Sequence, residues 1–435
     1  MTDNYTDTIA PATSPSGLLG EADIASVQRR TLRLLFATQI ISGVGFAIGS
    51  SVGALLAAEM AGVGLSGLAQ SASVIGGALF AIPATAIVRR YGRRPSLAAG
   101  YIVATAGAVI IVSATLLGSL PLLFAGFFLF GGGTTSNFQA RYAAVDLAPP
   151  ALRGRHLSLI IWATTLGAVA GPNLAPVAGT SLAPYGIPTL GAPFVFSAGL
   201  FLLAILLLVT LLRPDPMLVA QRQQRAHATS DARAHADRRG GMRAALQVVL
   251  ASPAARLGVS AMAVGHVVMV AIMSMTPVHI RGAGHDAAHT LRIVGVVISV
   301  HIAGMYAFSP VMGWLTDRLG RRAVIGGGIA LLLLACALAG TAGHDHRLLG
   351  AALMVLGLGW SATMVAGSTL LTDSVPTGLR ASSQGLSDLI MGLAAASGGA
   401  LSGVVVFAWG YPTLALIAAI MTAPLIALTF ASRLK

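Results

Sequence analysis

Charged side chains are scarce in this sequence. Asp, Glu, Lys and Arg make up 9% of the 435 residues, whereas 55% are hydrophobic. A soluble domain carries about 25% charged residues, so this shortage excludes an ordinary soluble protein. Apolar runs of about 18 residues or more, long enough to cross ~30 Å of hydrocarbon, recur along nearly the whole chain. The composition therefore predicts an all-α membrane protein with many spans.

Several chemistries are excluded because their residues are missing. The single lysine is Lys435, so the chain has no Gly-Lys-Ser/Thr phosphate loop and is not an ATP-driven pump. It also lacks the His-Glu-x-x-His motif of metalloproteases and paired His or Cys residues at helical spacing for haem or redox chemistry. The one cysteine, Cys336, has no intrachain disulfide partner. We therefore expect no cofactor, no metal and no enzymatic activity.

Basic residues are distributed unevenly about the apolar runs. The formal net charge is +13. We assume that the N-terminus lies inside the cell and that successive runs cross the membrane in alternating directions. All but three of the 27 Lys and Arg then fall on the inner side, the exceptions being Arg281, Arg292 and Arg347. Such an excess marks the cytoplasmic side of membrane proteins. We expect a protein of the inner (plasma) membrane, in contact with the lipid bilayer, with cytoplasmic termini and no nucleic-acid partner.

The apolar runs form two sets of six. The polar residues 1–33 are expected to be a cytoplasmic tail, and the Arg-, Ala- and His-rich residues 213–254 a cytoplasmic linker in which 242–250 forms a short interfacial helix. The two bundles are then 34–212 and 255–432. The expected spans are 34–58, 66–88, 96–118, 121–147, 156–180, 189–212, 256–280, 290–315, 323–343, 348–373, 382–408 and 411–431.

Short polar motifs recur at nearly the same offset in both halves, as expected of a duplicated unit. The turn after the second span of each half ends in Gly-Arg-Arg, and the segment after the fourth span has the pattern Asp-x-x-Pro-x-x-x-Arg. These motifs are Gly92, Arg93 and Arg94 with Gly320, Arg321 and Arg322, and Asp146, Pro149 and Arg153 with Asp373, Pro376 and Arg380. Two parallel six-span halves are an architecture of secondary transporters, in which the substrate binds between the halves.

The chain resembles the major facilitator superfamily from the first span to the last. GWLTDRLGRR (313–322) matches that superfamily's signature loop, Gly-x-x-x-Asp-Arg-x-Gly-Arg-Arg, at all six defined positions. The resemblance implies a major facilitator fold of two six-helix bundles with 12 transmembrane helices. It also implies transport by alternating access, in which the two halves move against each other.

The signature loops are candidates for a gating latch. Guanidinium and carboxylate groups at a tight turn form charge-assisted hydrogen bonds to facing helix ends. The resemblance implies that Arg93 pairs with Asp146 and Arg321 with Asp373, although these charges could instead only mark topology. The latch candidates are Arg89, Arg90, Gly92, Arg93, Arg94, Asp146, Arg153, Gly313, Asp317, Arg318, Gly320, Arg321, Arg322, Asp373 and Arg380.

The first signature loop, TAIVRRYGRR (85–94), departs from the superfamily pattern at two positions. Thr85 stands in place of Gly, and Arg89 in place of the Asp that in the family reaches across to the eleventh span. Arg89 is left to contact Asp388, helix-end carbonyls or lipid headgroups. The contact between halves that the Asp of this loop makes elsewhere in the superfamily is therefore not implied for this chain.

The fifth span contains Gly167-x-x-x-Gly171-Pro172. This pattern resembles the Gly-x-x-x-Gly-Pro element of the superfamily's exporting antiporters. Glycines at i and i+4 allow close helix packing, and proline kinks the helix beyond them. The alternative is ordinary packing of small residues in a membrane bundle.

Ionisable residues within the spans are few, and each is a candidate for carrying a coupling proton. The candidates are Asp388, Glu59, His266 and His301. Asp388 could instead be a counter-ion for a cationic substrate, or a structural partner of Arg89 or of a helix end. Glu59 could lie at the membrane interface, and both histidines could simply pack in the bundle.

A cavity lined by the first, fourth, seventh and tenth spans would be poor in charge. Its candidate residues are Gln39, Asn137, His266, Met269, Met273, Trp360 and Met364. Methionine adapts to varied apolar shapes and tryptophan offers an aromatic face, although both also fill membrane helices without further function. This set suits a hydrophobic or amphipathic small molecule.

These observations predict a proton-coupled exporter of a hydrophobic or amphipathic small molecule, working as a monomer. Its partners would be the small-molecule substrate, protons and lipid. The alternative is a proton-coupled importer of a small polar nutrient such as a sugar or a carboxylate. A membrane scaffold that transports nothing would not need the latch motifs in both halves.

Overall fold

The computed structural model describes residues 20–149, 152–227, 242–284, 286–376 and 379–431. Every regular element in these ranges is a helix. The first half contains α1 (Glu21–Ala61), α2 (Val63–Tyr91), α3 (Arg93–Leu117), α4 (Leu120–Phe130), α5 (Gly132–Ala143), α6 (Arg153–Ser181), the short 3₁₀ helix η2 (Ala183–Tyr185) and α7 (Ala192–Leu211). The linker contains α8 (Pro216–His227) and α10 (Met242–Ala251). The second half contains α11 (Pro253–Arg281), α12 (Ala287–Tyr306), α13 (Ser309–Leu319), α14 (Arg321–Thr341), α15 (His346–Ser374), α16 (Arg380–Ile420) and α17 (Ala423–Ala431).

The twelve predicted spans are confirmed, although three of them are broken helices. Nine stretches of the described residues are long and apolar enough to cross a membrane, including α12 together with α13 and α16 together with α17. Shorter helices α4 and α5 share the fourth span, and α6 forms the fifth. The stretch from α16 to α17 holds two spans, because the backbone turns at Gly410, where φ is 83°.

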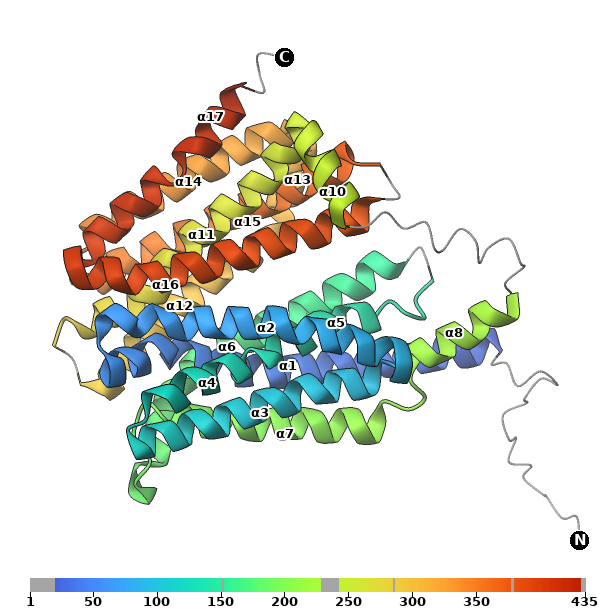
Figure 1. Ribbon diagram of the computed structural model, residues 1–435, viewed down its shortest axis with the longest axis horizontal. Helices are drawn as coiled ribbons and strands as arrows, with labels where there is room; N and C mark the ends of the chain where they lie inside the picture. Colours follow the sequence, from blue (N-terminus) through green and yellow to red (C-terminus); the bar gives the residue numbers. More distant parts are fainter. Residues whose placement is uncertain (1–19, 150–151, 228–241, 285, 377–378, 432–435) are drawn as a thin grey trace, which may run out of the picture.

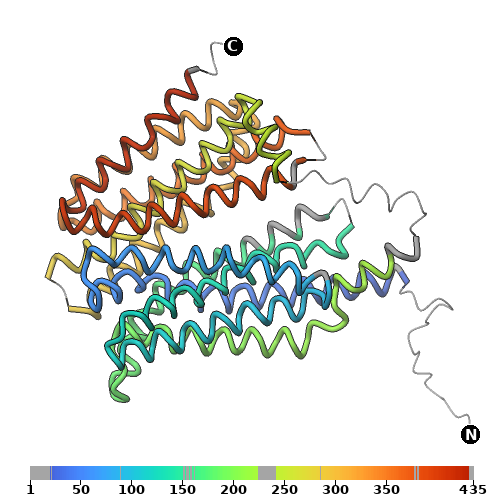
Figure 2. Tube along the Cα trace, in the orientation of Figure 1, coloured from blue at the N-terminus to red at the C-terminus, as the bar shows by residue number. Residues whose placement is uncertain are grey.

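The two halves form two helical bundles that lie side by side (Figure 1). Helices α1–α7 make one bundle and α11–α17 the other, so each bundle is a continuous part of the chain, as the colour gradient in Figure 2 shows. The bundles lie close together at one end and diverge toward the end that carries α8 and α10. We call this second end the linker end.

The first helix begins earlier than expected from hydropathy. Its first residue is Glu21 rather than residue 34, so part of the predicted tail is helical, while residues 1–19 lie outside the described ranges. Gln28 stabilises the extension: its Nε2 donates to the carbonyl oxygen of Ala144 at 2.7 Å and lies 3.0 Å from Nδ1 of His156. The extension thus packs on the first half itself.

Small residues bring the two halves together away from the linker end. The backbones of α2 and α16 meet where Gly67 contacts Gly399, and a side chain at Gly67 would collide with the Gly399 carbonyl. Beside it, Ser71 Oγ donates to the carbonyl oxygen of Ala396 at 2.6 Å. The symmetry-related contact joins α6 and α12, where Asn173 Nδ2 donates to Ser299 Oγ at 2.6 Å.

An ion pair joins the halves at the same closed end. Arg281, at the end of α11, lies 2.8 Å from the carboxylate of Glu59 near the end of α1. Both side chains are partly exposed, at 37% and 44%. The closed end therefore combines backbone contact inside the bundle with a charge pair at its rim.

We predict that Gly67→Val prevents the closed end from forming, because the new side chain would occupy the space of the Gly399 carbonyl. The measurement uses Glu59→Cys with Arg281→Cys in a Cys336→Ala background, joined by a short bifunctional maleimide. Cross-linking should be efficient in the parent and largely lost with Gly67→Val.

The matched control is Gly327→Val on α14, where an added Cβ would meet nothing within 4 Å. This control should cross-link like the parent. Equal cross-linking of the Gly67→Val protein would show that the α2–α16 contact does not hold the halves together.

Candidate functional site

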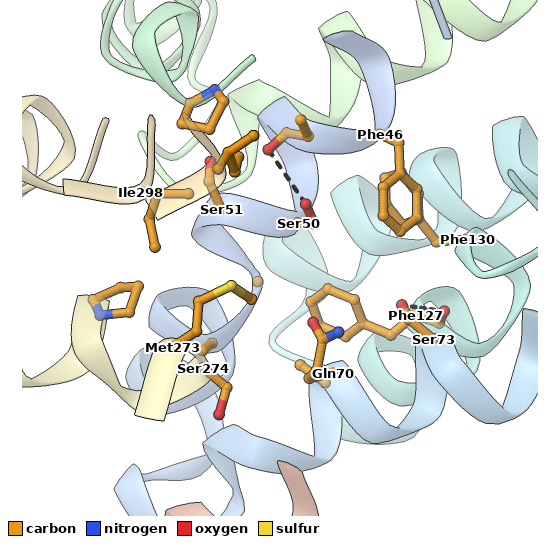
Figure 3. A pocket seen from close by; sticks show the side chains of 17 residues that line it. Phe46, Ser50, Ser51, Gln70, Ser73, Phe127, Phe130, Met273, Ser274 and Ile298 are labelled. Carbon is orange, nitrogen blue, oxygen red and sulfur yellow. Dashed lines mark hydrogen bonds between the residues drawn. The ribbon is translucent and has the colours of Figure 1, made fainter. Parts of the chain in front are cut away.

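A cavity of about 160 Å³ lies between the two halves (Figure 3). None of the described residues that line it is charged. The first half contributes Phe46, Ala47, Ser50, Ser51, Gly53 and Ala54 from α1, Ala69, Gln70 and Ser73 from α2, Phe127 and Phe130 from α4, and Pro172 from α6. The second half contributes Met273, Ser274 and Pro277 from α11 and Ile298 and Ile302 from α12.

The cavity has an aromatic wall. Phe46 and Phe130 stack with their ring centroids 5.2 Å apart, and Phe127 continues this wall toward Gln70 (Figure 3). Met273 and Ile298 of the second half face it from the other side. A flat or apolar molecule between these walls would contact both halves at once.

The serine hydroxyls around the cavity already use their protons. Ser50 donates to Ala47 O, Ser51 to Ile48 O and Ser73 to Phe127 O, at 3.3, 3.0 and 2.9 Å. Since a hydroxyl has one proton and two lone pairs, these three oxygens are left as hydrogen-bond acceptors. The cavity is thus neutral, with an excess of acceptors.

Of the predicted cavity residues, Met273 lines this cavity, whereas Gln39 and Asn137 are buried inside the first half. Tyr101 Oη donates within a buried network to Asn137 Oδ1 and lies 3.1 Å from Gln39 Oε1. Gln39 is fully buried and its Nε2 also lies 3.1 Å from Thr164 Oγ1. These two amides join helices α1, α3, α5 and α6 of one bundle.

The other predicted cavity residues belong to the second half. Trp360 Nε1 donates to Nδ1 of His266 at 2.9 Å, which leaves Nε2 to carry the proton of a neutral imidazole. Tyr306 packs edge-on against Trp360, with centroids 5.8 Å apart. Met269 is buried and Met364 half-buried. None of these five residues is among the described residues that line the cavity.

His301 is enclosed in the core of the second half. Its Nδ1 donates to the carbonyl oxygen of Leu353 at 2.8 Å, and its Nε2 has no partner among the described residues. The side chain is fully buried, so a proton has no open route to it in this conformation.

Asp388 and Arg141 lie on different halves and interact electrostatically. Asp388 is exposed on α16, and Arg141 of α5 lies over the ring of Phe138, 5.0 Å from its centroid. The two charges make no ion pair among the described contacts, and Arg141 Nε has no hydrogen-bond partner there. Glu59, in contrast, is held by Arg281.

The first copy of the signature loop forms a nearly buried charge cluster. Arg93 binds Asp146 through two hydrogen bonds of 2.8 and 3.0 Å, and its third nitrogen donates to Gln139 Oε1 at 2.7 Å. The side chains of Arg93 and Asp146 are 11% and 10% exposed. Asp215, which sequence reasoning missed, accepts from the backbone N–H of Arg94 at 2.8 Å and caps α8 through the N–H of Met217.

The second copy makes the same pairing with less support. Arg321 Nε donates to Asp373 Oδ2 at 3.0 Å, but these side chains are 33% and 50% exposed. Asp317 lies 3.9 Å from Arg321 and is 79% exposed. Because water screens exposed charges, we attribute less stabilisation to this pair than to Arg93–Asp146.

The remaining described signature residues include the glycines of the turn and arginines that lie over aromatic rings. Gly92 and Gly320 have φ of 92° and 88°, a conformation that other residues rarely adopt, which explains glycine at both positions. Arg90 and Arg318 lie over the rings of Tyr91 and Trp314, at 5.2 and 5.1 Å. Gly313 has open space around it and Arg322 is exposed. The side chains of Arg89, Arg153 and Arg380 lie outside the described part of the structure.

The Gly-x-x-x-Gly-Pro element lies where three helices meet. Gly167 and Gly171 pack directly against α1, at Gly43 and Ala47. The carbonyl of Pro172 contacts Gly295 of α12, and Pro172 lines the cavity. The element therefore couples packing within the first half to the contact between halves.

Comparison with known proteins agrees with this architecture. The family model described as Major Facilitator Superfamily matches residues 34–291 and 284–434, so the chain belongs to that superfamily of multi-pass membrane transporters.

Two relatives and one solved structure illustrate the similarity. YdeG of Bacillus subtilis (strain 168), an uncharacterized MFS-type transporter, is 39% identical over 410 residues, which cover 94% of this chain and 93% of YdeG. The riboflavin transporter RfnT of Brucella anthropi is 27% identical over 388 residues, covering 84% and 86%. A bacterial homolog of the human lysosomal transporter Spinster, in an inward-facing and unoccupied conformation, has a TM-score of 0.71 at 16% identity, covering 93% of this chain and 96% of that one. At that identity the match shows the fold alone.

The two latch copies should differ in their contribution to stability. Asp146→Asn leaves the Arg93 guanidinium without its carboxylate in a nearly buried site and should destabilise the protein by about 3 kcal/mol. Asp373→Asn removes an exposed partner and should cost less than about 1 kcal/mol. SDS-induced unfolding in mixed micelles measures the free energy of unfolding of both variants. An equal loss in the two would show that burial does not set the contribution of these ion pairs.

Proposed function

We propose that this protein is a secondary transporter that carries an uncharged hydrophobic or amphipathic small molecule across the membrane by alternating access. The observation that carries the proposal is the cavity between the halves, which is walled by Phe46, Phe127 and Phe130 and has no charged side chain among its described lining residues. Burying an ion there without a partner would cost several kcal/mol. A neutral molecule avoids this cost and still contacts both moving halves.

We place the linker end on the cytoplasmic side of the plasma membrane. The support is the distribution of basic residues, since the spans alternate and all but three Lys and Arg fall toward that side. The closed end with Glu59 and Arg281 then faces outward. In this orientation the two bundles diverge toward the cytoplasm (Figure 1). The protein works as a monomer, because both halves of the cavity come from one chain.

Export is the proposed direction, in exchange for protons. Its support is the Gly-x-x-x-Gly-Pro element, which resembles that of exporting antiporters and places Pro172 at the cavity. Asp388 is the best candidate for the coupling proton. It is exposed, it has no ion-pair partner among the described residues, and it lies in the field of Arg141 from the other half. Glu59 would first have to leave Arg281, and His301 is enclosed.

Uptake of a nutrient is the second candidate. The observation that favours it is the relative RfnT, named a riboflavin transporter, which aligns with 84% of this chain. Riboflavin joins a flat ring system to a polyol and is uncharged, so it combines the apolar and polar character of the cavity. A carboxylate substrate is disfavoured, because the described residues that line the cavity include no Arg, Lys or His.

Substrate-driven proton flux in proteoliposomes tests both candidates. The purified protein is reconstituted with an internal pH dye, and neutral antibiotics, lipophilic cations, sugars, carboxylates and riboflavin are added in turn. Proton movement opposite to a neutral lipophilic compound is the expected result. Movement together with a sugar, carboxylate or riboflavin would establish uptake instead.

Asp388→Asn should abolish the dependence of transport on a proton gradient, because an amide cannot take up the coupling proton. Substrate exchange without a gradient should persist. The control is Asp345→Asn, since Asp345 caps α15 through the N–H groups of Arg347 and Leu348, and asparagine caps a helix equally well. Unchanged proton dependence in the Asp388→Asn protein would assign the carboxylate a structural role.

A further inference from the structure

Among the described residues that line the cavity, Gln70 is the one whose side-chain hydrogen-bonding groups make no hydrogen bond. It lies on α2, and its carboxamide points into the cavity beside Phe127 (Figure 3). Within the described part of the chain its side chain makes no hydrogen bond, whereas the neighbouring serines Ser50, Ser51 and Ser73 bond to helix carbonyls. A carboxamide offers two N–H donors and a carbonyl acceptor side by side.

An uncommitted amide in an apolar cavity favours one kind of partner. Leaving its groups unpaired in a partly closed site is costly, and a ligand that supplies one acceptor and one donor in the same plane removes that cost. A ring with adjacent N–H and C=O groups, a lactam edge, forms two antiparallel hydrogen bonds with a carboxamide. The serine oxygens, which have already donated their protons, accept from any further N–H or O–H group of the ligand.

The aromatic wall and the volume restrict the rest of the ligand. The rings of Phe46 and Phe127 favour a flat partner, since aromatic pairs gain from stacked or edge contacts beyond their buried area. The cavity volume is about 160 Å³. A protein cavity of about 150 Å³ holds benzene, so the part of the ligand inside this one has one or two rings.

We propose that Gln70 is the specificity-determining residue of this cavity and that the cavity takes a small, flat, uncharged ring system with a lactam edge. The edge pairs with the Gln70 carboxamide while the ring lies against the phenylalanine wall. This inference deepens the proposed transport function and rests on it. Because Gln70 belongs to the first half and Met273 faces it from the second, the ligand would bridge the two bodies that move.

Two probe molecules and one variant test this assignment. The probes are 2-quinolone, which has the lactam edge, and N-methyl-2-quinolone, in which a methyl group replaces the N–H. Binding to the purified full-length protein in nanodiscs is measured by isothermal titration calorimetry. We expect 2-quinolone to bind the native protein about tenfold more tightly, because the N-methyl group removes the N–H donor that pairs with the carboxamide.

Gln70→Leu removes the amide and leaves an apolar side chain of similar volume. It should weaken 2-quinolone binding about tenfold and leave N-methyl-2-quinolone nearly unchanged, so that the preference between the probes disappears. Retained binding of the N-methyl probe shows that the variant is folded with its cavity intact. Gln384→Leu, on α16 with its amide near Thr372, is the matched control and should keep the native preference.

Three outcomes overturn the assignment: equal binding of the two probes to the native protein, no binding of 2-quinolone at millimolar concentration, or an unchanged preference in Gln70→Leu. The proteoliposome proton flux distinguishes this failure from failure of the transport proposal. Flux driven by another neutral compound, with no preference for the lactam, would reject the role of Gln70 and leave transport standing.

Discussion

The close contact between the backbones of α2 and α16 is the constraint on which the rest of the structure depends. Inside a bilayer there is no hydrophobic force to hold two apolar bundles together, so association rests on packing of small residues and on buried hydrogen bonds. Gly67 against Gly399 and Ser71 on the Ala396 carbonyl supply both. This contact closes one end, brings Glu59 to Arg281 and encloses the cavity between Gln70 and Met273.

Most of the fold could be predicted from the sequence, because the bilayer restricts the chain so strongly. Backbone groups in hydrocarbon must be bonded within the segment, so each long apolar run becomes a helix. The breaks were less predictable. The fourth span divides at Gly131, and the chain bends at Gly410, so that α16 contributes to two spans. Hydropathy also missed the polar start of α1, which is held by Gln28.

The cavity could be predicted only in its chemical character. Gln39 and Gln70 are both glutamines within spans, but Gln39 is enclosed by Tyr101 and its neighbours whereas Gln70 faces the cavity. The rotation of each helix about its own axis decides which of the two glutamines faces the cavity. A single sequence does not specify that rotation. The spacing of Gln70 and Ser73, one helical turn apart in an apolar span, was the available signal. Likewise, two identical Gly-Arg-Arg turns differ in burial because Gln139 and Asp215 surround only the first.

The two linker helices are attached to different bodies. Asp215 anchors the start of α8 to the first half, through the backbone of Arg94, whereas α10 buries Ala245 and Val249 against residues of the second half. In the proposed alternating-access cycle, each helix would therefore travel with its own bundle. If the halves move as proposed, the separation between α8 and α10 would follow that movement, and labels on these two helices would report it from the aqueous phase without any substrate.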